Sequence, residues 1–231
     1  MQVSYSQPSF SGKHVFLIGP PGAGKGKLAE FLLRRKYFHL ALGDILRDKS
    51  TPIGQQCKPY FERGEPVPNE ISFEVFRQTF SAALGRNQLV IVDGMLQTEE
   101  DISFFANFIE AHSLEDKCGI LFLKLSKEIA KDRILNRIIC EGCKCIYSKK
   151  SKQLQCQKCK ATLIERIDDI REQAIMKRLN RFFEVTLASP FLSRLIEKSK
   201  AKSLYLEVDA ELDLERLEKE YAKIFDNASC V

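Results

Sequence analysis

The amino-acid sequence predicts an α/β fold in which helices cover both faces of a five-stranded parallel sheet. Short, continuous apolar runs alternate along the 231 residues with segments whose apolar residues recur at helical spacing. Continuous apolar runs are typical of strands that are buried on both faces, as in a parallel sheet. A glycine-rich segment, Gly19–Lys25, lies between the first apolar run and the first helical pattern. That placement indicates a phosphate-binding loop.

Five apolar runs have lengths suited to buried strands. They lie at His14–Ile18, Tyr37–Leu40, Leu89–Val92, Gly119–Leu125 and Leu204–Val208. Between them, Gly26–Arg35 and Asp101–His112 carry apolar residues every three or four positions. This spacing predicts amphipathic helices that pack on the sheet.

Two segments interrupt the alternation and predict separate units. Residues 41–86 contain helical patterns but no strand pattern, and in residues 136–169 the apolar content falls while Cys, Lys and Gln become frequent. The second segment is too polar to form a core unaided. We therefore expect an N-terminal extension at 1–11, a core formed by 12–40, 87–135 and 170–226, a helical insert at 41–86 and a metal-stabilised minidomain at 136–169.

Composition narrows the classes of partner. The net charge is +5, from 36 basic and 31 acidic residues that are interspersed, unlike the one-sided charge of a nucleic-acid-binding protein. No apolar stretch approaches the roughly 18 residues of a membrane-spanning helix, and residues 1–10 are polar and rich in serine, unlike a signal peptide. We expect a cytoplasmic monomer with small anionic ligands and with no nucleic-acid or membrane partner.

The glycine-rich segment matches the Walker A pattern, Gly19-x-x-x-x-Gly24-Lys25. Its glycines let backbone N–H groups turn toward phosphates, the following helix adds partial positive charge, and Lys25 supplies a full charge. A glycine-rich turn without a ligand is the alternative, which this spacing and placement disfavour. The sequence therefore predicts a P-loop NTPase fold.

Five of the eight cysteines lie between residues 140 and 159. Cys140-x-x-Cys143 and Cys156-x-x-Cys159 are separated by twelve residues, a spacing typical of a tetrahedral zinc site. Four thiolates leave no open position for water, so a structural Zn²⁺ is expected. Cys145 is a spare thiol that could replace one of the four.

The phosphate loop also carries a family resemblance. Gly19–Gly26 reads Gly-Pro-Pro-Gly-Ala-Gly-Lys-Gly and resembles the loop of adenylate kinases and related nucleoside-monophosphate kinases residue for residue. Leu42–Arg47 is similar to the family's Thr-Gly-Asp-x-Leu-Arg, Gly64–Glu70 to Gly-x-x-Val-x-Asp-Glu, and Val90–Thr98 to a strand followed by Asp-Gly-Phe-Pro-Arg-Thr. Zinc-containing members carry such a cysteine quartet in the lid that closes over ATP.

The resemblance implies a role for each matching residue. ATP is expected to contact Gly22, Ala23, Gly24, Lys25, Gly26, Lys27, Arg133 and Arg137. AMP is expected to contact Leu42, Arg47, Val67, Gly94, Gln97, Asp101, Arg166 and Arg178. The catalytic cations would be Lys25, Arg133, Arg137, Arg166 and Arg178, and Mg²⁺ would be held through water by Asp44 and Asp93. Zinc would be held by Cys140, Cys143, Cys156 and Cys159.

The acceptor side departs from the family pattern. Leu42 stands where the family has threonine, Gln97 where it has arginine and Asp101 where it has glutamine, while Lys27 replaces a threonine on the donor side. An amide supplies neither the charge nor the planar fork of an arginine. The first hypothesis is transfer of the ATP γ-phosphoryl group to AMP, giving two ADP. The alternatives are another acceptor, such as GMP read by Asp101, or a nucleotide-binding regulatory protein with weak catalysis.

Asp101 also admits a structural interpretation. Thr98-x-x-Asp101 precedes an apolar helical run, a pattern typical of a helix N-terminus, and this interpretation is favoured over a base-reading role.

Overall fold

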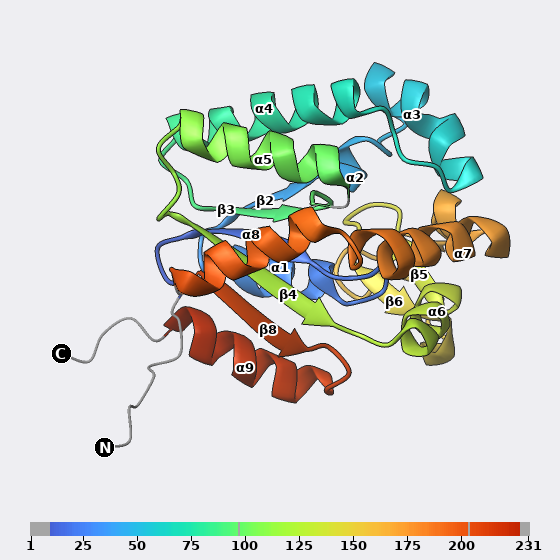
Figure 1. Ribbon diagram of the computed structural model, residues 1–231. Coiled ribbons are helices and arrows are strands. Elements are labelled where there is room, and N and C mark those ends of the chain that lie inside the picture. The colour runs from blue at the N-terminus through green and yellow to red at the C-terminus, as the bar shows by residue number, and fades with distance from the viewer. Residues whose placement is uncertain (1–9, 97, 203, 227–231) are drawn as a thin grey trace.

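A computed structural model describes residues 10–96, 98–202 and 204–226. Five parallel strands form one sheet in the order β2-β3-β1-β4-β8. They are β1 His14–Ile18, β2 Phe38–Ala41, β3 Val90–Asp93, β4 Cys118–Lys124 and β8 Tyr205–Asp209. The predicted α/β fold and its five strands are confirmed, and no strand end is shifted by more than one residue (Figure 1).

Helices cover both faces of the sheet because successive residues of each strand point to opposite sides. Phe16 and Ile18 of β1 pack in a core formed with α4 Asn69–Gly85, α5 Glu99–Ala111 and α8 Pro190–Ala201. Val15 and Leu17 pack on the other side. That second core is formed with α1 Lys25–Leu33, α6 Lys127–Leu135, α7 Glu172–Asn180 and α9 Leu214–Asp226.

The segment between β2 and β3 is helical, as its sequence predicts. It contains α2 Leu42–Ile45, α3 Pro52–Arg63 and α4. The Thr51 side chain accepts a hydrogen bond from the Gly54 N–H and so caps α3, and Pro52 occupies the first helical turn, where its missing N–H costs nothing. This insert lies at the top of Figure 1, and its helix α4 packs on one face of the sheet.

Residues 137–164 contain a second, antiparallel sheet that the sequence did not predict. Its strands are β5 Arg137–Cys140, β6 Ile146–Ser148 and β7 Leu163–Ile164, in the order β6-β5-β7. Two short 3-10 turns, η1 Lys149–Ser151 and η2 Ile167–Asp169, follow β6 and β7. The strands were missed because they are only two to four residues long and lie in a segment that is otherwise rich in Lys, Cys and Gln.

The described chain starts inside the core. Phe10, which the predicted boundary assigns to the N-terminal extension, is fully buried against Phe225 and Gly119, and its N–H donates to the carbonyl of Ile224. None of the helices among the described residues is long and apolar enough to cross a membrane.

Candidate active site

One cleft of about 610 Å³ lies at the carboxyl end of β1 and β3, between the main sheet, the helical insert and the small sheet. Every described residue that the sequence analysis assigned to nucleotide or magnesium binding lines it. These are Gly22, Ala23, Gly24, Lys25, Gly26, Lys27, Leu42, Asp44, Arg47, Val67, Asp93, Gly94, Asp101, Arg133, Arg137, Arg166 and Arg178. Gln97 lies outside the described residues.

The phosphate loop joins β1 to α1 and requires glycine for steric reasons. Gly22 has φ +87°, and a Cβ atom there would lie 2.9 Å from the Ala130 carbonyl oxygen. A larger residue would therefore combine backbone strain with a clash. The Lys25 ammonium group donates hydrogen bonds to the carbonyl oxygens of Gly19 (2.9 Å) and Pro20 (3.0 Å), which hold it within the loop.

The charges around Lys25 favour an anionic ligand. Burial lowers the pKa of Lys25, and Arg137, Arg166 and Arg178 lower it further, while Asp93 alone opposes them. Concentrated positive charge of this kind is stabilised when a phosphate enters the cleft.

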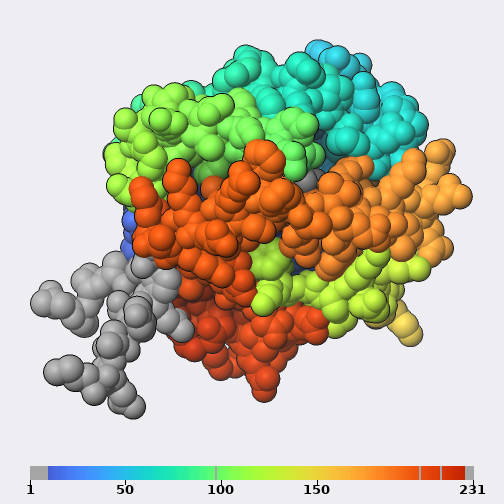
Figure 2. Space-filling model, in the orientation of Figure 1, coloured from blue at the N-terminus to red at the C-terminus, as the bar shows by residue number. Residues whose placement is uncertain are grey.

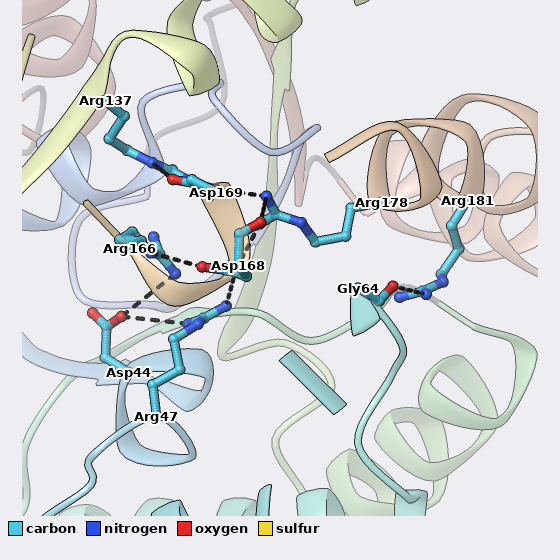
Figure 3. Close-up of polar contacts among 9 residues, drawn as sticks. All are labelled: Asp44, Arg47, Gly64, Arg137, Arg166, Asp168, Asp169, Arg178 and Arg181. Atoms are coloured by element: carbon cyan, nitrogen blue, oxygen red, sulfur yellow. Dashed lines mark hydrogen bonds and ion pairs between the residues drawn. The ribbon is translucent and has the colours of Figure 1, made fainter. Parts of the chain in front are cut away.

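Asp168 is the buried centre of the arginine cluster. Its side chain is 0% exposed and lies 3.0 Å from Arg47 Nη2, 2.6 Å from Arg178 Nη1 and 3.4 Å from Arg166 Nε. Figure 3 shows these arginines reaching it from three different segments. Burial opposes the charge of Asp168, but the arginines outweigh it and hold its pKa well below the usual range.

Asp169 extends the cluster on the other side. It accepts two hydrogen bonds from Arg137, at 2.7 and 2.9 Å, and one from Arg178 at 2.6 Å. Bidentate pairs fix the plane of a guanidinium group as well as its position. Desolvation and the neighbouring Arg166 lower the pKa of Arg47 to about 10. The two carboxylates therefore orient the arginines, whose positive charges repel one another.

Comparison with known proteins agrees with this arrangement. A family model described as adenylate kinase matches residues 17–193. The chain belongs to the adenylate kinase family. An adenylate kinase of Clostridium tetani is 29% identical over 227 residues, covering 94% of this chain and 97% of its own. One of Mycoplasmopsis pulmonis is 31% identical over 216 residues (90% and 96% covered), and one of a Wolbachia species is 32% identical over 174 (73% and 80%).

Adenylate kinases use ATP with Mg²⁺, and two acidic residues in this cleft suit a hydrated magnesium ion. Asp93 ends β3, and Asp44 lies in α2, 3.6 Å from Arg47 and 4.0 Å from Arg166. Both line the cleft with the phosphate loop. Carboxylates that bind Mg²⁺ through its waters need only face the phosphates.

The remaining donor-side cations differ in their partners. Lys27, at the family's threonine position, lies 3.5 Å from Glu30, a neighbour in the same helix. Within the described part of the chain, Arg133 makes no hydrogen bond or ion pair. It lines the cleft and so remains available to a ligand.

Asp101 caps α5. Its carboxylate accepts from the Thr98 N–H at 3.0 Å, and its own N–H donates to Thr98 Oγ1 at 3.1 Å, which completes a capping box. The helix-capping interpretation of Thr98-x-x-Asp101 is thus confirmed, although Asp101 also lines the cleft.

The cysteine quartet fits a zinc ion. The Sγ atoms of Cys140, Cys143, Cys156 and Cys159 all lie within 4.8 Å of one another, and two of the pairs are 3.3 and 3.4 Å apart. A tetrahedral site with Zn–S bonds of about 2.3 Å needs sulfur atoms about 3.8 Å apart. Cys145 is not part of the group that the described residues form. The quartet therefore holds four thiols in a geometry compatible with structural zinc.

The two halves of the quartet share one turn geometry. The Lys144 N–H donates to the Cys140 carbonyl at 3.1 Å, and the Lys160 N–H to the Cys156 carbonyl at 2.9 Å. Both lysines have positive φ, of 60° and 63°. Each Cys-x-x-Cys pair therefore presents its thiols from a matching backbone turn.

Sequence analysis missed two important residues. Asp168 was assigned no role, although it orients three arginines. Arg181 was not singled out, yet it lines the cleft and donates to the Gly64 carbonyl at 2.9 Å. Its spacing of three residues from Arg178 on a helix was the available signal, because such residues share a face.

Proposed function

We propose that the protein catalyses reversible transfer of the γ-phosphoryl group from ATP to AMP, giving two molecules of ADP. The observation that supports this most strongly is the convergence of Lys25 and four arginines, Arg47, Arg137, Arg166 and Arg178, on one cleft. Phosphoryl transfer depends on positioning and electrostatic stabilisation, which such a set supplies.

The donor half of the cleft would hold ATP. Backbone N–H groups of Gly22–Gly26 would surround its phosphates at the start of α1, and Lys25 would release its loop carbonyls to bind the transferring group. Arg133 and Arg137 would contact ATP from α6 and β5.

The acceptor half would hold AMP. Arg47 of the helical insert would bind its phosphate together with Arg166 and Arg178. All three arginines already form ion pairs with Asp168, which brings them together. Leu42, Val67 and Gly94 line the neighbouring part of the cleft with apolar surface suited to a base.

The chemistry needs no general base. An oxygen of the AMP phosphate, already an anion, forms a bond to the γ-phosphorus as the bond from that phosphorus to the ATP β-oxygen breaks, and the electron pair leaves on ADP. The arginines stabilise charge spread over the oxygens in transfer. Asp44 and Asp93 would hold Mg²⁺ through its waters, and the ion would neutralise part of the phosphate charge.

The units predicted from the sequence would divide this work. Residues 136–169, with a structural zinc, would form a lid that excludes water from the cleft, and residues 41–86 would form the acceptor arm. We further propose a cytoplasmic monomer that acts on free nucleotides, without nucleic-acid or membrane partners.

A coupled assay with AMP, GMP, CMP and UMP tests the proposal. We expect AMP to be the preferred acceptor and to exceed GMP by at least about tenfold, because the Asp101 carboxylate that would read guanine is engaged in a helix cap. If ATP binds but no acceptor gives turnover, the kinase activity is refuted and the chain is a nucleotide-binding homologue.

The second candidate function is a nucleotide-binding protein with weak catalysis, which is favoured because Gln97 stands where the family has arginine. Gln97→Arg should then raise kcat about a hundredfold, because it restores a bidentate contact to the transferring group. Gln97→Lys is the matched control, since it restores charge without the planar fork and should raise kcat less. No gain with arginine would show that position 97 does not limit the rate.

A further inference from the structure

The helix that carries Arg178 continues into an unusual turn. Residues Arg181–Thr186 form a π-helical segment, η3, in which the Leu187 N–H donates to the Phe182 carbonyl at 3.0 Å. π-Helical turns are rare and frequently lie at functional sites. Arg181, Phe182 and Thr186 all line the substrate cleft, so this turn faces the site.

Arg181, the first residue of the turn, is a cation in an unfavourable place. Burial lowers its pKa, the neighbouring Arg178 lowers it further, and Glu65 opposes them. Among the described residues, Arg181 has no carboxylate within 4.0 Å. Its guanidinium instead donates from Nη2 to the carbonyl oxygen of Gly64 at 2.9 Å.

Gly64 marks the end of α3 in the helical insert. Its φ of +66° closes the helix, and its carbonyl lies at the C-terminal end, where the helix dipole is negative. A guanidinium group that donates to this carbonyl therefore acts as a charged cap of α3. The contact is stronger than one in water because Arg181 is partly desolvated.

The same place is a close contact between α3 and α7. A Cβ atom at Gly64 would lie 2.7 Å from both Cα and the carbonyl oxygen of Ala174. Ala174, Arg178 and Arg181 are spaced i, i+4, i+7, so one helix face docks the insert, holds Asp168 and caps α3. Figure 3 shows Arg178 directed at the aspartates and Arg181 at Gly64, and Figure 2 shows the insert meeting the α7 segment at the surface.

We propose that Arg181 is a positioning residue of the acceptor site, which holds the end of α3 against α7 and keeps the acceptor arm closed. Residues 65–68 follow Gly64 directly and carry Val67 into the cleft, where its side chain is buried. Holding Gly64 thus fixes the wall against which the acceptor nucleotide binds. The choice of AMP as the affected ligand rests on the proposed kinase function. The contact between Arg181 and Gly64, here called the clamp, rests on the geometry alone.

Steady-state kinetics tests the effect on substrate. Arg181→Met removes the charge and keeps much of the apolar stem, and should raise the KM for AMP about tenfold while the KM for ATP stays within about twofold. Arg181→Lys retains the charge and can still donate to the carbonyl, so its KM for AMP should lie between those of the wild type and Arg181→Met. Lys198→Met, at an exposed position of α8, is the charge-matched control and should change neither constant. Equal rises in both KM values, or no change in the KM for AMP, would overturn the proposal.

Amide hydrogen exchange tests the clamp without turnover. In Arg181→Met, exchange within residues 52–64 should become about tenfold faster, while exchange in residues 137–148 should match the wild type. Unchanged exchange in α3 would refute the clamp even in an active kinase. Faster exchange in a protein that phosphorylates no acceptor would instead support the clamp and refute the proposed function.

Discussion

Replacing Asp168 by asparagine removes one charge and almost no volume from the centre of the arginine cluster. The carboxylate is fully buried, and Arg178, Arg47 and Arg166 lie 2.6, 3.0 and 3.4 Å from it. Removing one partner of a buried ion pair costs about 3–5 kcal/mol, because the remaining charge stays desolvated. We expect the lower end, about 3 kcal/mol, because Asp169 still binds Arg178.

Urea unfolding with zinc present measures this change as a shift of the midpoint at constant m-value. The control is Asp116→Asn, whose side chain is 83% exposed beside Lys202 and should have little effect. The folded pKa of Asp168 lies below its unfolded value of 3.8, so its contribution is complete above that pH and is lost only on further acidification. A loss no larger than that of the control, or one that varies between about pH 5 and pH 8, would refute the proposed role of the buried charge.

Three further changes test other parts of the structure. Lys25→Met should lower kcat about a thousandfold without loss of stability, because burial already disfavours this charge; a melting temperature that falls with the activity would contradict this. Cys143→Ser should reduce bound zinc, measured by elemental analysis, well below one equivalent and lower the melting temperature, whereas Cys145→Ser should retain the metal; equal zinc in both variants would reject the quartet. His14 accepts a hydrogen bond from the Val90 N–H, and burial lowers its pKa, so its contribution to stability is present above the unfolded pKa of 6.5 and is lost as the pH falls below it. His14→Asn can accept the same bond without titrating and should lose less stability between about pH 7 and pH 5.5; parallel losses would rule this out.

Local patterns predicted those features that neighbouring residues determine. The phosphate loop was recognised because Gly19, Gly24 and Lys25 lie in one short segment that joins a strand to a helix. The cap of α5 was predictable from Thr98-x-x-Asp101 for the same reason. In each case the interacting groups are at most a few residues apart, so spacing alone fixes the geometry.

Features that depend on distant segments were not predicted. The sheet order β2-β3-β1-β4-β8 and the three short strands of residues 137–164 follow from pairing across the chain. Asp168 contacts Arg47 across 121 positions, and Arg181 reaches Gly64 across 117. No local pattern distinguishes Asp168 from a solvated carboxylate, and the spacing of Arg178 and Arg181 predicts a shared helix face but not the contact with Gly64.

By itself, the sequence determined the fold class, the phosphate loop, the spacing of the four cysteines and the set of cations that a phosphate would need. Only the tertiary structure decided that Asp168 orients the arginines and that Arg181 caps α3 at Gly64. Propensity and motif spacing act over a few residues, whereas the desolvation that strengthens a buried charge arises only when separate segments pack together.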